Sequence, residues 1–203
     1  MTIIDCYASL NSPWTYLGCE RLADIADRHG CTIAVKPAQF GKVFAQTGGL
    51  PLPRRSPERR AYRMMELKRW RDNLSIPITL EPKHFPADEA LGVQFLIGAI
   101  DRGDDALSLL REIGRAVWER DEDIAQPDVL MAAAQRAGLD GAAILADAPS
   151  LEDARDRHDA YTQQALAAGV FGAPSCVLPD GEIFWGQDRL ALLDWRLGQK
   201  TSA

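Results

Sequence analysis

Short apolar runs that favour strands stand near both ends of this chain, and helical spacing fills most of the sequence between them. Close to the start, residues 3–8 are apolar and strand-prone. Apolar residues then recur at helical spacing from Leu17 to Ala26, and Gly30 is of the type that most often follows a helix. Residues 32–35 form a second β-branched run. This order predicts a strand–helix–strand unit with parallel strands.

The middle of the chain is predicted to be mostly helical. Glycines and prolines interrupt the apolar pattern from about Phe40 to Arg60, which predicts a loop or irregular region there. The stretch from Ile76 to Pro86 is expected to be irregular for the same reason. Helical patterns cover much of the remainder, at about 60–74, 87–101, 105–119, 128–137 and 151–168.

Strand signals return near the end of the chain. Residues 175–178 and 182–185 flank the turn residues 179–181 (Pro-Asp-Gly), a sequence typical of a β-hairpin. A last helix is predicted from about Asp188 through Leu197. The two ends together supply four strands and two helices, so we expect an α/β domain with one mixed sheet, built from residues 1–40 and 169–203. Residues 41–168 would then form a large, mainly helical insertion.

The composition excludes some classes of function. The chain has 203 residues and a formal net charge of -6, whereas a nucleic-acid-binding protein needs an excess of Lys and Arg to displace counterions from phosphates. No stretch approaches the roughly 20 apolar residues that span a bilayer. The start of the chain also lacks a signal-peptide pattern. We therefore expect a cytoplasmic protein that binds neither nucleic acid nor membrane.

The four cysteines, Cys6, Cys19, Cys31 and Cys176, lie far apart in the sequence. No two of them form the C-x-x-C pair of a dithiol redox motif or of a zinc knuckle, and no metal site is predicted. A structural disulfide is not expected in a reducing compartment. We interpret all four as small hydrophobic residues of the core.

Ser12 and Pro13 follow the first strand and form a strong start signal for a helix. The first turn of a helix presents unpaired N–H groups and the positive end of the helix dipole, which together stabilise an anion such as a thiolate. A serine hydroxyl at this point can either cap the helix or donate a hydrogen bond to a bound thiolate. Taken alone, the motif favours the cap.

Two segments near the end of the chain can also carry chemistry. Ala173 and Pro174 precede the third strand, and a cis bond between them would present the N–H and C=O of Ala173 to a peptide-like ligand. Gln187 and Asp188 stand at the start of the last helix, where Asp188 either caps the helix or helps to grip the charged end of a small ligand.

Together and in this order, these segments resemble the 2-hydroxychromene-2-carboxylate isomerases, which are relatives of the kappa-class glutathione transferases within the DsbA-like group. The resemblance rests on S-P-W-T-Y-L at 12–17, G-V-F-G-A-P at 169–174 and W-G-Q-D-R at 185–189, with support from 66–70 and 76–77. It spans nearly the whole chain. It implies a thioredoxin-like fold with a helical insertion, a homodimer, and glutathione as the cofactor.

The resemblance also implies roles for individual residues. The glutathione thiol is expected beside Ser12, which becomes the candidate catalytic residue. Ala173, before a cis Pro174, is expected to pair through its backbone with the cysteine of glutathione. Gln187 and Asp188 are expected to hold the γ-glutamyl end. Asp188 matches the family, whereas the family often has Asn or Ser where this chain has Gln187.

The activity that the resemblance implies is glutathione-dependent cis–trans isomerisation of an aromatic 2-oxo acid, of the type that converts 2-hydroxychromene-2-carboxylate to trans-o-hydroxybenzylidenepyruvate. A small aromatic carboxylate needs a cation and an apolar wall. The irregular stretch that carries Arg54 and Arg55 is the expected source of the cation, with Arg54 as the candidate residue, because a guanidinium binds a carboxylate through two hydrogen bonds. Trp14, His84 and Phe85 are expected along the substrate.

Two other functions stay open at this point. A kappa-class-like glutathione transferase or peroxidase would use the same bound thiol, and a non-catalytic thioredoxin-fold binding module would need no reaction. Dithiol oxidoreductase activity is excluded at this site, because Ser12 and Thr15 stand where the redox relatives have the two cysteines of C-x-x-C.

Overall fold

The two ends of the chain meet in one mixed sheet. The computed structural model describes residues 1–199 and contains the four strands expected from the sequence: β1 (Ile3–Ala8), β2 (Thr32–Pro37), β3 (Ser175–Val177) and β4 (Ile183–Trp185). Their order across the sheet is β2-β1-β3-β4; β1 pairs parallel with β2 and antiparallel with β3, and β3 pairs antiparallel with β4. Cys6 of β1 stands between Val35 and Cys176 in this register. The expected α/β fold is confirmed.

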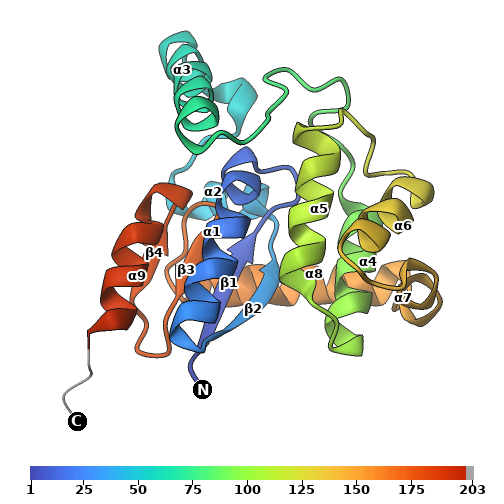
Figure 1. Ribbon diagram of the computed structural model, residues 1–203. Coiled ribbons are helices and arrows are strands. Elements are labelled where there is room, and N and C mark those ends of the chain that lie inside the picture. Colours follow the sequence, from blue (N-terminus) through green and yellow to red (C-terminus); the bar gives the residue numbers. More distant parts are fainter. Residues whose placement is uncertain (200–203) are drawn as a thin grey trace.

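Two helices contributed by the chain ends lie next to this sheet (Figure 1). Helix α1 (Pro13–His29) ends at Gly30, whose φ of 61° is the left-handed conformation that a glycine adopts without strain. The last helix, α9 (Leu190–Gly198), packs against α1. It begins two residues later than predicted, because residues 187–189 form a separate 3₁₀ turn, η2 (Gln187–Arg189).

The middle of the chain is helical, as predicted, with two additions. Its helices are α2 (Phe40–Thr47), α3 (Pro57–Leu74), α4 (Ala90–Arg102), α5 (Ala106–Trp118), α6 (Pro127–Arg136), α7 (Gly141–Asp147) and α8 (Leu151–Ala167), with a 3₁₀ turn η1 (Leu52–Arg54). The irregular region predicted over 40–60 was wrong in its first part, because Phe40 and Val43 of α2 are buried against Tyr7 and Val177 of the sheet. The short α7 escaped prediction; Asp140 caps it through the amide of Ala143.

The inserted helices share a hydrophobic core with the sheet. One cluster of buried side chains joins Ile4 of β1 and Leu17 of α1 with Phe95 of α4 and Ile113 of α5. Helix α5 makes extensive contact with α1, and α3 stands apart at one end of the molecule, beyond the first turn of α1 (Figure 1). None of the helices within residues 1–199 is both long enough and apolar enough to cross a membrane.

The cysteines belong to this core. Cys6, Cys19 and Cys176 are buried, Cys31 is half-buried, and all four are free thiols. Burial raises the pKa of the Cys19 thiol, and a hydrogen bond with Cys6 together with burial raises that of Cys176. A buried thiol with a raised pKa carries little thiolate at neutral pH, so Cys19 and Cys176 are poor nucleophiles.

Candidate functional site

The first turn of α1 leaves several hydrogen-bond donors without partners. The hydroxyl oxygen of Ser12 accepts from the Thr15 amide at 3.2 Å, and the Ser12 carbonyl accepts from Tyr16 at 3.1 Å. Pro13 has no N–H. Among the described residues, this leaves the Trp14 amide and the O–H groups of Ser12 and Thr15 without acceptors, because capping uses only a lone pair of the Ser12 hydroxyl. The Thr15 side chain is buried, so the Trp14 amide and the Ser12 O–H are the donors open to a ligand. No acidic residue lies in this turn. The helix start therefore offers two donors and a positive dipole end to an anion.

The loop that leads into this turn is held by Glu89. One oxygen of its carboxylate accepts from the Ser9 hydroxyl at 2.7 Å and from the Asn11 amide at 2.5 Å. The Asn11 side chain, in turn, exchanges two hydrogen bonds of 2.9 Å with the backbone of Ala87. Burial raises the pKa of Glu89. The segment before α4 therefore fixes the position of Ser12 from outside the sheet.

The Ala173–Pro174 bond is cis, the geometry that the resemblance requires. The carbonyl of Pro174 accepts from the Gly186 amide at 2.8 Å, which connects this segment to the turn after β4. Among residues 1–199, neither the N–H nor the C=O of Ala173 has a hydrogen-bond partner. Ala173 therefore has a free backbone donor and acceptor.

The turn after β4 positions Gln187 and Asp188. Gly186 has a φ of 97°, and a Cβ atom at this position would collide with the Asp188 carboxylate, so only glycine fits. The side chain of Gln187 is buried, and its oxygen accepts a hydrogen bond from Arg21 of α1. Asp188 is exposed and accepts from Arg189 at 2.7 Å. Of the two predicted side chains, Asp188 is the one open to a ligand.

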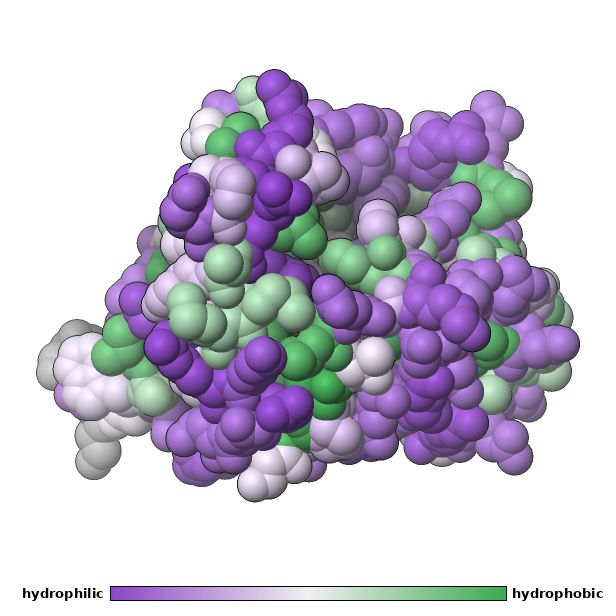
Figure 2. Space-filling model, turned by 90° about the horizontal axis from the view of Figure 1, so that it is seen from above, coloured by the Kyte–Doolittle hydropathy of each residue, from purple (hydrophilic) through white to green (hydrophobic). Residues whose placement is uncertain are grey.

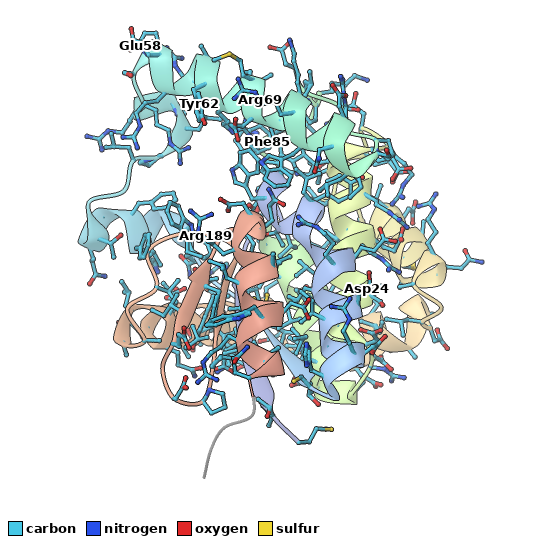
Figure 3. The ribbon with its side chains drawn as sticks, turned by 60° about the vertical axis from the view of Figure 1, so that its left-hand side comes forward. Asp24, Glu58, Tyr62, Arg69, Phe85 and Arg189 are labelled. Carbon is cyan, nitrogen blue, oxygen red and sulfur yellow. The ribbon has the colours of Figure 1, made fainter. Side chains whose placement is uncertain are left out.

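A cavity of about 330 Å³ brings several of these groups together. It lies between α3 and η2, the turn that precedes α9; in Figure 3, Tyr62 on α3 and Arg189 of η2 are on opposite sides of this space. Ser12 is not among its lining residues but stands two positions before Trp14, which is. The lining comprises Trp14, Tyr62, Glu66, Trp70, Ala173, Trp185, Gly186, Gln187, Asp188 and Arg189. We call it the peptide cavity.

A second cavity of about 420 Å³ adjoins the first and shares Trp14, Tyr62 and Glu66 with it. Its other lining residues are Arg55, which precedes α3, and three residues from the first half of α3: Glu58, Arg59 and Arg63. We call it the arginine cavity. Figure 2, which views the molecule from the α3 end, shows a mostly hydrophilic face crossed by a band of apolar side chains.

Not all of the predicted substrate residues reach these cavities. Trp14 lines both. Arg54 is exposed in η1, outside either lining. Phe85 packs on the buried Trp118 ring at a centroid distance of 4.8 Å, below α3 (Figure 3). His84 is half-buried and lies outside both linings. The pKa of Asp123 is lowered by hydrogen bonds from Gln126 and Ala125 and, to a smaller extent, by His84.

Several lining residues were absent from the sequence-based site. Tyr62, Glu66 and Trp70 belong to one helix, and their spacing of four residues places them on one face of it. That pattern was visible, but nothing in the sequence indicated that this face covers the start of α1. Arg59 and Arg63 share the same spacing, and Arg21 meets Gln187 across 166 positions of sequence.

Comparisons with known proteins agree with this geometry. Residues 3–198 match the DSBA-like thioredoxin domain family. The chain is 31% identical over 193 residues to a 2-hydroxychromene-2-carboxylate isomerase of Sphingobium xenophagum, covering 94% of this chain and 95% of the relative. It is 28% identical over 218 residues to glutathione S-transferase kappa 1 of Homo sapiens, covering 97% and 91%.

Solved structures show the same likeness. That of a 2-hydroxychromene-2-carboxylate isomerase superimposes with a TM-score of 0.77 at 26% identity, over 97% of this chain and 94% of the other. A probable DsbA oxidoreductase from Streptomyces coelicolor, at 18% identity and a TM-score of 0.74, shares the fold. The chain therefore belongs to the DSBA-like thioredoxin domain family, within the group formed by 2-hydroxychromene-2-carboxylate isomerases and kappa-class glutathione transferases.

Proposed function

We propose that this protein is a glutathione-dependent cis–trans isomerase of an aromatic 2-oxo acid, of the 2-hydroxychromene-2-carboxylate kind. The observation that carries the proposal is the start of α1, where two free donors and the helix dipole await an anion beside a cavity. Positions 12 and 15 hold Ser and Thr, so the protein supplies no thiol there. A thiolate cofactor is the anion that such a site serves best.

The residues present fit glutathione. The carboxylate of Asp188 matches the ammonium of the γ-glutamyl end, and the free N–H and C=O of Ala173 match the backbone of the central cysteine. Ala173, Asp188 and Trp14 line the same cavity. A tripeptide held in this way would have its sulfur near Ser12. When bound, glutathione supplies a nucleophilic sulfur that adds reversibly to an α,β-unsaturated ketone, which permits rotation about the former double bond.

The protein's own groups would contribute orientation and electrostatics. The Ser12 hydroxyl and the Trp14 amide both donate hydrogen bonds to a thiolate, which lowers the pKa of the thiol and raises the fraction ionised at neutral pH. Glu89 holds these donors in place through Asn11. Trp14 is half-buried and lines both cavities, so its indole would border the bound cofactor.

The direct test measures isomerisation of 2-hydroxychromene-2-carboxylate by absorbance, with and without glutathione. We expect turnover only with glutathione, and binding of glutathione in calorimetry. Turnover of chlorodinitrobenzene without isomerisation would instead support the kappa-class-like transferase, which the 28% identity to the human kappa enzyme favours as second candidate. Absence of glutathione binding would contradict both and leave a binding module.

Replacement of Asp188 by alanine is expected to weaken glutathione binding about tenfold, the loss of one charged hydrogen bond of about 1.4 kcal/mol. The rate at saturating glutathione should change little, because this carboxylate lies away from the sulfur. The dissociation constant by calorimetry and kcat together check this. Asp72→Ala is a matched control, since Asp72 is also exposed and paired with the preceding arginine at 2.8 Å. Unchanged affinity in the Asp188 variant would refute the role.

A further inference from the structure

The arginine cavity carries an uncompensated positive charge. No carboxylate within residues 1–199 forms an ion pair with Arg55, Arg59 or Arg63. On the same helix, Arg69 pairs with Glu66 at 2.5 Å, which also neutralises one of the two acidic residues lining the cavity. The side chains of three arginines thus line a common space, and none of them has an ion-pair partner in the described part of the chain; the Nε of Arg55 donates to the Leu50 carbonyl at 2.8 Å.

The remaining acidic residue, Glu58, forms its hydrogen bonds within the first turn of α3. Hydrogen bonds with its own backbone and with Ser56 hold its pKa below the usual range, as expected for a carboxylate in the first turn of a helix. Glu58 is exposed and forms no ion pair with the three arginines. It therefore leaves their charge uncompensated.

Arg63 is the most enclosed of the three. Its guanidinium carbon lies 5.6 Å from the centre of the Phe85 ring and 5.8 Å from that of Trp118. Burial, and then the charge of Arg55, lower its pKa to about 10; burial, and then Arg59, lower that of Arg55. The lowered pKa means that keeping Arg63 charged in the folded protein costs free energy. A bound anion would reduce this cost.

We propose that the arginine cavity binds the carboxylate of a planar aromatic acid, with Arg63 as its main partner and Arg55 and Arg59 in support. A guanidinium held against two aromatic rings keeps its donor edge free for a carboxylate, which it binds through two parallel hydrogen bonds. Trp14 and Tyr62 supply the apolar walls for the ring system. The part of this inference that concerns turnover rests on the proposed function.

The aromatic acid, rather than glutathione, is the ligand that the arrangement of the two cavities favours for the arginine cavity. The groups that match glutathione, Ala173 and Asp188, line the peptide cavity, and none of the three arginines does. Trp14 lines both cavities, so an acid held in the arginine cavity would contact the same indole that borders the peptide cavity.

The test compares benzylidenepyruvate, an aromatic unsaturated 2-oxo acid, with its methyl ester, which lacks the anionic charge. The variant is Arg63→Met, and the matched control is Arg60→Met, which removes an exposed arginine of the same helix outside the cavity lining. Glutathione-dependent conversion of each compound gives kcat/KM, and quenching of tryptophan fluorescence gives binding of each compound without glutathione.

We expect Arg63→Met to lower kcat/KM and affinity for the acid by about 10- to 100-fold, the usual size of a charged hydrogen bond, and to leave the ester unaffected. Arg60→Met should match the wild type. Equal affinity of the wild type for acid and ester, or an Arg63→Met defect confined to glutathione binding, would overturn the inference. A wild type that prefers the acid but binds no glutathione would support the inference and refute the proposed function.

Folding of the variant does not limit the test. Methionine in place of an unpaired, half-buried charge is expected to raise the melting temperature by about 2–4 °C. If Arg63 serves binding at the expense of stability, the melting temperature of Arg63→Met should rise. If Arg63 serves packing, the melting temperature should fall. Arg59→Gln, at an exposed position, provides a second variant with the same direction of effect on the acid.

Discussion

Replacement of Ser12 by alanine is expected to lower the glutathione-dependent turnover by about 100- to 1,000-fold, the range seen when one preorganised donor to a developing or bound anion is lost. The hydroxyl that caps α1 also has its proton free, so one side chain can serve the helix and the thiolate together. The Trp14 amide would remain as the single donor. The measurement is kcat at saturating glutathione, with the thiol pKa of the complex read from thiolate absorbance.

The structural part of this effect can be separated from the chemical part. Loss of the cap should lower the free energy of unfolding by about 0.5–2 kcal/mol. Ser150→Ala is the control, because Ser150 caps α8 by accepting from the Asp153 amide at 3.1 Å, and it also donates to the Asp153 carboxylate at 2.7 Å. We expect a loss of stability at least as large, but full activity, in that control. Ser12→Thr keeps the hydroxyl and should recover much of the rate; full activity in Ser12→Ala would reduce Ser12 to a cap.

Local signals predicted the parts of the fold that depend on neighbouring residues. The start of α1 was predictable because Ser12, Pro13 and the helical spacing after them act within one turn. The hairpin of β3 and β4 follows from its turn in the same way. The irregular region over 40–60 failed as a prediction at α2, because that helix is stabilised by burial of Phe40 and Val43 against the sheet, which no local pattern records.

The same distinction between local sequence signals and tertiary packing applies to the candidate site. The residues on the chain ends came from motifs, whereas the covering helix α3 contributes Tyr62, Trp70 and Arg63 through a packing that only the three-dimensional structure reveals. The sequence predicts the cation in the stretch with Arg54 and Arg55; the lining of the arginine cavity contains Arg55 and Arg63 but not Arg54. Charge alone does not distinguish one arginine of a basic segment from the next; burial does.

Two replacements of Glu89 should separate its role as a hydrogen-bond acceptor before α1 from the effect of its charge. Glu89→Ala removes the acceptor of the Ser9 hydroxyl and the Asn11 amide, leaving both without a partner. We expect a loss of about 1–3 kcal/mol in the free energy of unfolding, the penalty for unpaired buried groups. Turnover should fall with it, because Ser12 follows Asn11 directly. Chemical denaturation and kcat check the two effects.

Glu89→Gln keeps an acceptor oxygen in place and removes only the charge. Since burial raises the pKa of Glu89 in the folded state, the folded protein binds this proton more tightly than the unfolded chain. The wild type therefore loses stability as pH rises from the ordinary carboxyl value of about 4.5 to the raised folded value, and no further beyond it. The glutamine variant lacks this loss, so the two should be equally stable near pH 4 and the variant more stable at pH 8. A variant that is less stable at pH 8 would show that the carboxylate charge itself holds the loop before Ser12.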